Sequence, residues 1–142
     1  MRSMHDISEW VFPHVNLTPQ TISTITTTNG TTVNRLAAGF VGFESALAVY
    51  SMRTLTGTGS PNLQVTIQNS ADGGSTWTTV NDRDGNPATR NHVAAANDQT
   101  FALDMSTMAG QFRFSIASLG ATISSELDAY FLLAGERYTS TF

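Results

Sequence analysis

Residues 62–77 read NLQVTIQNSADGGSTW, and this stretch decides the fold. From Asn62 to Asn69 apolar and polar residues alternate strictly, and this period of two is typical of a half-buried β-strand. Asp72-Gly73-Gly74 then forms a turn by composition, because glycine tolerates the positive φ angles that tight turns need. Residues 76–80 are predicted to return as a second strand. The side chains predicted to face the core are Leu63, Val65 and Ile67.

Patterns of the same kind recur along the chain. Further strands are predicted at residues 21–26, 31–36, 45–55, 100–105, 111–118 and 124–134. Asn29-Gly30 favours a hairpin turn between the first two, because both central residues of a type I′ turn need positive φ. Residues 37–43 are predicted to form a glycine-rich bend, and residues 81–97 a long loop of the kind that is usually functional. About eight strands at this spacing predict an all-β, jelly-roll-like antiparallel β-sandwich.

The first 19 residues lack this regular pattern. Pro13 and Pro19 exclude one continuous helix, so we expect residues 1–19 to form an N-terminal arm with at most a helical turn near residues 6–10. Residues 20–142 are then expected to form a single sandwich domain. Trp10-Val11-Phe12 is costly to leave in water and must pack on this domain or on a neighbouring chain.

The composition excludes several classes of partner. Charged residues make up 13% of the chain, against about 25% in a typical soluble domain, and the formal net charge is −4. The seven basic residues are scattered arginines, which disfavours binding to a nucleic-acid backbone. No apolar run approaches the roughly 18–20 residues that would cross a membrane. Without cysteine the chain has neither disulfides nor thiolate metal sites.

No catalytic or metal-binding pattern stands out. His5, His14 and His92 are too far apart in sequence for a metal pair on one helix. Asp82-x-Asp84-Gly85-Asn86 lacks the full ligand spacing of a calcium loop, and its residue types are those of ordinary turns. We therefore expect no enzyme activity, no cofactor and no metal ion.

One local motif has five defining positions: Ser70, Asp72, Gly74, Thr76 and Trp77. It resembles the Asp-box, Ser-x-Asp-x-Gly-x-Thr-Trp, of sialidases and related β-propeller proteins. Physically, the aspartate would accept backbone N–H bonds in the turn, the glycine would permit positive φ, and the tryptophan would hold the hairpin together. The chain has one copy and is too short for a propeller, so the resemblance implies a structural turn and not a sialidase.

A broader resemblance runs from Ser45 to Arg137. A Gly-Ser-Pro loop at residues 59–61 precedes the alternating strand and the Thr-Trp turn, Phe112-Arg113-Phe114 follows, and Gly135-Glu136-Arg137 closes the pattern. This order looks like that of small virion proteins of tailed bacteriophages. The resemblance implies a jelly-roll-like sandwich that decorates or cements the capsid shell, or that sits in the tail or baseplate. It supplies no catalytic residues.

These observations together predict a structural protein of the virion that is assembled in the host cytoplasm. We expect a capsid decoration protein that binds the assembled shell, with the major capsid protein or other virion proteins as partners and neither nucleic acid nor membrane. A homo-oligomer is expected, with a trimer favoured. Aromatic anchors are typical of interfaces, so the expected partner-binding residues are Trp10, Val11, Phe12, Phe40 and Phe43.

Three alternatives stay open at this point. The first is a tail, neck or baseplate component of the same particle. The second is a carbohydrate-binding or host-attachment module, in which Trp77, Tyr50 and Tyr130 would form a platform for sugar rings. The third is an enzyme, for which no acid–base pair or nucleophile is evident.

Overall fold

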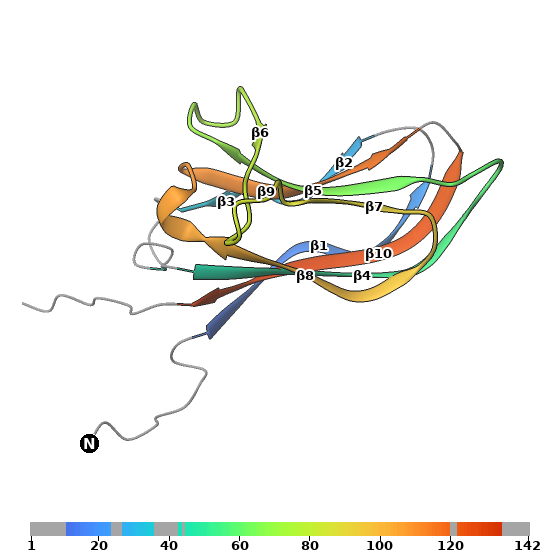
Figure 1. Ribbon diagram of the computed structural model, residues 1–142, viewed down its shortest axis with the longest axis horizontal. Helices are drawn as coiled ribbons and strands as arrows, with labels where there is room; N and C mark the ends of the chain where they lie inside the picture. Colours follow the sequence, from blue (N-terminus) through green and yellow to red (C-terminus); the bar gives the residue numbers. More distant parts are fainter. Residues whose placement is uncertain (1–10, 24–26, 36–42, 44, 120–121, 135–142) are drawn as a thin grey trace, which may run out of the picture.

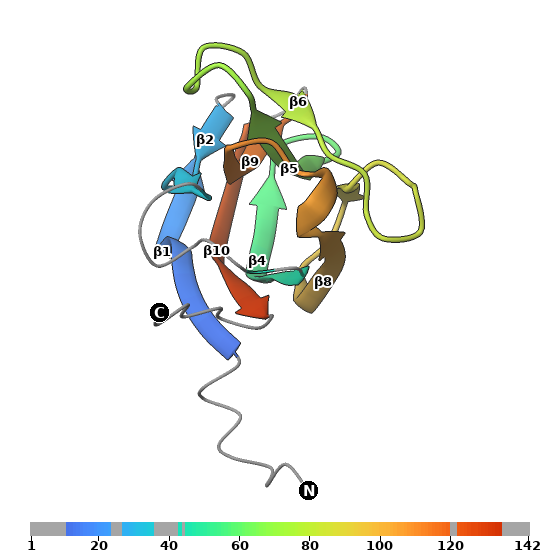
Figure 2. The same ribbon diagram turned by 90° about the vertical axis from the view of Figure 1, so that its left-hand side faces the viewer.

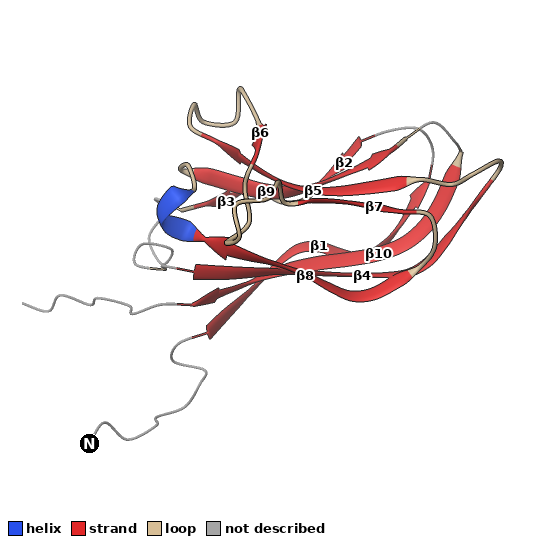
Figure 3. Ribbon diagram, viewed as in Figure 1, coloured by secondary structure: helices blue, strands red, loops and turns tan. Residues whose placement is uncertain are grey.

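Two antiparallel sheets face each other across one apolar core (Figures 1 and 2). The computed structural model describes residues 11–23, 27–35, 43, 45–119 and 122–134, without the side chains of residues 11, 12 and 23. Sheet A contains β1 (Val11–Ser23), β10 (Ile123–Ala134), β4 (Ser45–Gly57) and β8 (Ala96–Asp104), in that spatial order. Sheet B contains β2 (Thr27–Asn29), β3 (Val33–Asn34), β9 (Gln111–Ser118), β5 (Leu63–Ser70), β6 (Thr78–Thr79) and β7 (Thr89–His92). Within the described ranges, the helical structure is the short 3₁₀ segment η2 (Met105–Thr107) (Figure 3).

The strand order is that of a jelly roll. Both β2 and β3 pair with β9, and both β6 and β7 pair with β5, so each pair occupies one interrupted strand position. Ten segments therefore fill eight positions. Numbered along the chain, the positions run 1-8-3-6 in sheet A and 2-7-4-5 in sheet B. The first and last strands lie side by side, as in a double Greek key. The predicted all-β, jelly-roll-like sandwich of about eight strands is confirmed.

The core forms where the inward faces of the two sheets meet. Phe131 of sheet A lies 4.9 Å from Phe112 and 4.8 Å from Phe114 of sheet B, measured between ring centroids. The predicted inward face of β5 is fully buried at Leu63, Val65 and Ile67. In β10 the predicted side is buried as well: Leu127, Ala129, Phe131 and Leu133. Strict alternation was enough to assign these strands, because one face of each is covered and the other is not.

Residues 11–19 belong to the sandwich, which corrects the expected boundary of the arm at residue 19. They form the first part of β1, which pairs with β10 from Val11 opposite Ala134 to Ser23 opposite Ser124. The two prolines are tolerated because β1 is the outermost strand of sheet A, where proline costs no ladder hydrogen bond on the open side. Register shifts on either side of Leu17 accommodate the irregular sequence. Residues 1–10, including the predicted helical turn, lie outside the described residues.

The hairpin predicted at Asn29-Gly30 is absent, because β2 and β3 follow each other along the same partner, β9. Gly30 does not adopt positive φ; its N–H donates to the carbonyl oxygen of Phe114, at 2.9 Å. A Cβ atom at residue 30 would lie 1.7 Å from Oδ1 of Asn16. Glycine is therefore required here by a close tertiary contact and not by a turn. Residues 81–97, predicted to form one long loop, contain β7 and the start of β8. The irregular segments of this region are therefore shorter than expected.

Candidate functional site

Only some of the predicted docking residues lie in the part of the chain that the structure describes. Trp10 and Phe40 lie outside the described residues. The backbone of Val11 and Phe12 begins β1, opposite Ala134 and Leu133, but their side chains are not among the described parts of the structure. Phe43 is 3% exposed and belongs to the core cluster, so its ring packs inside the sandwich and is not presented to a partner. This corrects the expected role of Phe43.

The five residues of the turn motif hold one another in place. Oγ of Ser70 accepts the N–H of Gly74 at 2.9 Å, and Oδ1 of Asp72 accepts the N–H of Thr76 at 2.8 Å. Nε1 of Trp77 donates to the carbonyl oxygen of Gly74, at 2.9 Å. These hydrogen bonds lower the pKa of Asp72 to about 2. The largest contribution comes from the N–H of Thr76 and the second from the hydroxyl of Ser70. These contacts stabilise a connection at the end of β5 and use the polar groups of the motif in doing so.

The outer face of sheet B consists of polar side chains that pair across strands. Gln64 donates to Asn91 at 3.1 Å, and the hydroxyls of Thr66 and Thr89 are 3.2 Å apart. Farther along, the guanidinium carbon of Arg113 lies 3.8 Å from the ring centroid of Trp77, and Nη2 donates to Gln68 at 3.2 Å. Among the residues named here on the outer face of sheet B, only Arg113 carries a charge.

The aromatic platform expected for a carbohydrate-binding module is not formed. Tyr50 is fully buried, and its hydroxyl lies 2.7 Å from Nε2 of His92 in the core. Tyr130 alternates with buried Ala129 and Phe131, so it faces outward from sheet A, whereas Trp77 contacts Arg113 on sheet B. The three rings therefore lie in three different environments.

The buried Tyr50–His92 pair links the two sheets. The pKa of His92 is lowered, mainly by burial and secondly by the positive charge of Arg90. Burial raises the pKa of Tyr50 to about 12. Both groups are therefore held in their neutral forms near neutral pH. Within the described ranges, no group of three His, Asp or Glu side chains converges to hold a metal ion. Nor does any described helix have the length and apolar character needed to cross a bilayer.

The outer face of sheet A is apolar at one end. Register places Leu132 of β10 beside Leu47 of β4, and Leu47 beside Ala102 of β8. The neighbouring row runs from Val15 through Tyr130 to Val49. Sheet A is the lower layer in Figure 1, and no described element covers this surface. We call the following six residues the apolar end of sheet A: Val15, Leu47, Val49, Ala102, Tyr130 and Leu132.

Charged groups gather at the other end of the same face. Arg53 of β4 contacts Glu126 at 2.9 Å and Asp128 at 3.5 Å, both on the neighbouring strand β10. The apolar end is instead the end at which β1 begins, at Val11, and β10 ends, at its register partner Ala134. The ion pairs of Arg53 thus lie at one end of the outer face of sheet A. At the other end, Asp104 of β8 lies beside Ser45 at the border of the apolar end.

An open depression of about 240 Å³ lies within the apolar end. It is lined by residues of β4, β8 and β10 and by Arg83 of the β6–β7 connection. Val15, on the far side of the same face, is 58% exposed and is among the most exposed large apolar side chains described. The surface therefore has a projecting side chain at one border and a hollow at the other. The lining residues are Ser45, Ala46, Leu47, Arg83, Ala102, Leu132 and Ala134.

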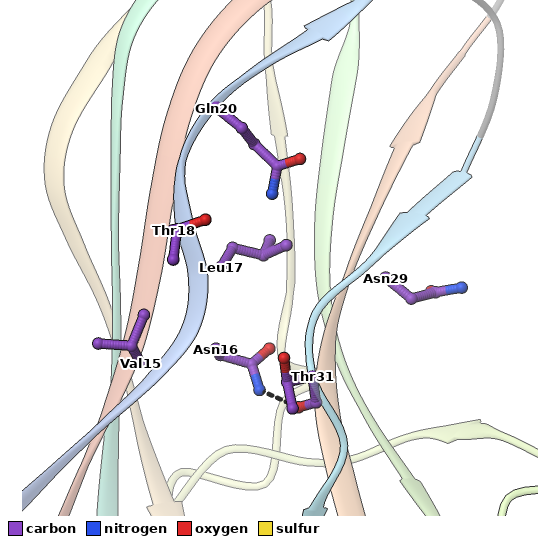
Figure 4. Close-up of a pocket in the computed structure, with 7 residues that line it drawn as sticks. All are labelled: Val15, Asn16, Leu17, Thr18, Gln20, Asn29 and Thr31. Carbon is purple, nitrogen blue, oxygen red and sulfur yellow. Dashed lines mark hydrogen bonds between the residues drawn. The ribbon is translucent and has the colours of Figure 1, made fainter.

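A second pocket, of about 200 Å³, opens between β1 and β2 and is structural (Figure 4). Asn16 crosses from β1 toward sheet B, donates through Nδ2 to the carbonyl oxygen of Thr31 and accepts the N–H of Phe114 through Oδ1, at 3.0 Å. This side chain is 3% exposed, and both ends of its amide are used. The contacts explain why β1 joins the sandwich despite its prolines.

The chain has little similarity to known proteins. No protein-family model matches the chain, and no curated protein matches it. The chain is similar to one in the "Structure of infectious bursal disease virus Gt strain", with a TM-score of 0.42 and 13% identity. The alignment covers 90% of this chain and 32% of that chain, so the protein spans about a third of the length of that viral chain. The strand order described above, and not this similarity, defines the jelly roll.

The apolar end of sheet A was not predicted from the sequence, although one signal pointed to it. The first half of β4 is apolar on both faces, with Ala46, Ala48 and Tyr50 inward and Leu47 and Val49 outward. Such a pattern is expected of a strand that is covered on both sides. On the outward side Leu47 is only partly covered, whereas Val49 is 6% exposed.

Proposed function

We propose that this protein is a structural, non-enzymatic component of a virus particle, and specifically a decoration or cement protein on the head of a tailed bacteriophage. The observation that carries this proposal is the apolar end of sheet A. An antiparallel sheet that faces water usually carries polar side chains on that side. A contiguous apolar area on a small domain instead marks a surface that is covered by protein.

The division of charge supports an assembly role. Charged residues are depleted at the centres of protein interfaces, and on sheet A the ion pairs of Arg53 are confined to the half away from the chain ends. β1 begins at Val11, at the border of the apolar end. The aromatic anchors that we expect to reach the shell are Trp10, Phe12 and Phe40.

The proposed mechanism is additive binding. The protein binds the assembled shell and not its free subunits, so mass action stabilises the assembled state. Each bound copy bridges neighbouring capsid subunits and opposes their separation. Binding through several linked copies would increase the effective affinity without any new contact. The sequence resemblance to phage virion proteins is what directs this proposal to the capsid shell.

Particle fractionation tests the proposal. Virions of the source phage are separated into heads and tails, and the chain is quantified in each fraction by mass spectrometry. A decoration protein will be found on heads, in copy numbers comparable with those of the shell sites that it covers. Recovery with tails at low copy number would instead establish the tail or baseplate alternative. Absence from purified particles would show that the proposal is wrong.

A binding experiment tests the arm. Heads stripped of the protein are mixed with purified protein carrying Trp10→Ala together with Phe12→Ala. We expect binding to weaken by about 30-fold or more, because aromatic anchors in interfaces typically contribute about 2 kcal/mol or more. Val93→Ala is the matched control, since Val93 is 71% exposed but lies in the β7–β8 turn at the other end of the sandwich (Figure 1). Undiminished binding of the double variant would exclude the arm as the docking element.

A further inference from the structure

We propose that residues 89–99 form a flap that closes one side of the sandwich and opens when His92 takes up a proton. The flap comprises β7, the turn after it and the start of β8. The rest of the sandwich stays folded in this transition. The inference does not depend on the proposed function, because it concerns a movement within one copy of the chain.

The flap connects the two sheets and has one buried anchor. Its first part, β7, pairs with β5 of sheet B, and β8 is the outermost strand of sheet A beside β4 (Figure 1). Within the flap only the side chain of His92 is buried, and the other residues are half-buried or exposed. Ala88 before it and Phe101 after it are again buried in the core. A segment with so few buried contacts opens at a lower free-energy cost than the core strands.

The anchor is a hydrogen bond between the sheets. Nε2 of His92 lies 2.7 Å from the hydroxyl of Tyr50, whose side chain is fully buried. In the neutral ring Nε2 can accept the hydroxyl proton, whereas a protonated ring carries an N–H at both nitrogens and cannot accept it. Protonation would also bury a positive charge among apolar side chains. The closed flap therefore needs a neutral His92.

Arg90 adds a fixed positive charge beside this anchor. Its guanidinium carbon lies 4.8 Å from the ring centroid of Phe101, and Nη1 donates to Oε1 of Gln99 at 2.9 Å. These contacts to β8 hold the side chain in place, and its charge is the second cause, after burial, of the lowered pKa of His92. A proton on His92 would therefore place two positive charges in the flap close together.

The other charged groups of the strands around His92 are engaged elsewhere or exposed. β5 carries none. Arg53 of β4 forms ion pairs on the outer face of sheet A. Of the two acidic residues of β8, Asp98 is exposed and Asp104 caps η2 at the far end of the strand. No carboxylate of β4, β5, β7 or β8 is therefore buried beside His92 to compensate its charge.

The start of β8 is strained, which lowers the cost of opening further. Between the pairs Tyr50–Gln99 and Met52–Ala96, two residues of β8 face one of β4, which makes a β-bulge. Asp98 in this bulge has a φ of +52°, and every other described residue with positive φ is a glycine. A residue with a side chain pays an energetic cost for this conformation, and the open flap would release it.

The pH range follows from the ordinary pKa of histidine, about 6.5. In the open flap His92 meets water and titrates near that value, while in the closed flap burial lowers its pKa. Above about pH 6.5 both forms are neutral and the flap is closed. Below it the open form binds a proton that the closed form does not, so the opening equilibrium rises by up to about tenfold between pH 7.5 and pH 5.5.

Hydrogen exchange followed by mass spectrometry tests the flap in the unmodified protein. Exchange is measured at pH 7.5 and pH 5.5 and corrected for the intrinsic pH dependence of amide exchange. We expect protection of residues 89–99 to fall by about five- to tenfold at pH 5.5, while peptides from the central strand β10 keep theirs. An equal loss in β10 would show global unfolding and overturn the local flap. Unchanged protection of residues 89–99 would overturn it as well.

Matched variants assign the effect to one side chain. His92→Gln keeps an acceptor for Tyr50 but does not titrate in this range, so protection of the flap should be equal at both pH values. His14→Gln on β1 and Asp98→Asn in the bulge should keep the pH dependence. Persistence of the dependence in His92→Gln, or its loss in Asp98→Asn, would contradict the assignment to His92.

A titration of His92 by nuclear magnetic resonance needs no variant and therefore decides the case even if His92→Gln folds poorly. The ring protons of His92 in the folded protein should titrate below about pH 6.5. A pKa at or above that value would show that protonation does not favour the open flap, and the inference would fail.

Discussion

The outer faces of the two sheets differ although both sheets cover the same core. On sheet B the outward side chains satisfy one another across strands, as in the pairs Gln64–Asn91 and Thr66–Thr89. On sheet A the outward side chains are apolar at one end, and their surface is not covered by any described element. A face of the first kind is complete in the isolated molecule. A face of the second kind gains free energy when another protein covers it.

The largest effect should be the same for both sheets, because their inward faces are equivalent. Phe131→Ala in sheet A and Phe114→Ala in sheet B each remove a fully buried ring from one cluster. We expect each variant to lower the free energy of unfolding by about 3–5 kcal/mol, measured by urea denaturation. A cost confined to one sheet would show that the two inward faces do not share a core.

The second prediction separates the outer faces directly. Leu132→Arg places a charge in the apolar end of sheet A, whereas Gln64→Arg places the same charge on the outer face of sheet B. We expect Leu132→Arg to weaken binding to phage heads by about 2–3 kcal/mol, roughly 30- to 150-fold, because a charge would be buried without a partner. Gln64→Arg should leave head binding unchanged. Binding of each variant to heads stripped of the protein measures both effects, and equal effects would remove the distinction between the faces.

The third prediction concerns the hydrogen bond between Tyr50 and His92, one of those that join the two sheets. Tyr50→Phe leaves Nε2 of buried His92 without its partner and should cost about 1–3 kcal/mol of stability. Because the pKa of His92 is lowered on folding, the unfolded chain binds a proton that the folded protein does not. The free energy of unfolding should therefore fall as the pH drops below about 6.5.

Thermal or urea unfolding between pH 7 and pH 5 tests this dependence. It should disappear in His92→Gln and persist in the control His14→Gln, which changes a histidine on β1. Persistence in His92→Gln would assign the pH dependence to another group.

The smallest effect is expected in the turn after β5. Asp72→Ala removes the acceptor for the N–H of Thr76, so amide hydrogen exchange at Thr76 should accelerate while global stability changes little. The pKa of Asp72 is lowered to about 2, so the carboxylate's contribution is present above about pH 4 and is lost as the pH falls toward 2. Asp84→Ala, in another exposed turn, is the control. Unchanged exchange at Thr76 would mean that the carboxylate does not hold the turn.

The sequence predicted those strands whose faces differ in polarity. The alternation of β5 and β10 was sufficient, because water on one side and the core on the other imposes a period of two. The position of β1 could not be read in this way. Pro13 and Pro19 exclude a central strand but not an edge strand, and no local pattern says which neighbour a strand will have. The turn signal at Asn29-Gly30 was overridden by a contact with Asn16, which is distant in sequence.

The candidate site was harder to predict for a related reason. Val15, Leu47 and Leu132 come from three strands and lie on one surface only because of the strand register. The sequence shows that β4 begins with apolar residues on both faces. It does not distinguish a side covered by the same chain from one left for a partner. Aromatic content alone led to Phe43, which the core uses instead.

The pairing of the first strand with the last has a practical consequence for engineering. Val11 and Ala134 are register partners, so polypeptides fused before β1 or after β10 would emerge together. The turn after β4 lies at the opposite tip, where Gly59 has a φ of +79° and a Cβ atom would meet no described atom within 4 Å (Figure 1). A foreign epitope inserted there would be displayed outward, on the tip opposite to Val11 and Ala134.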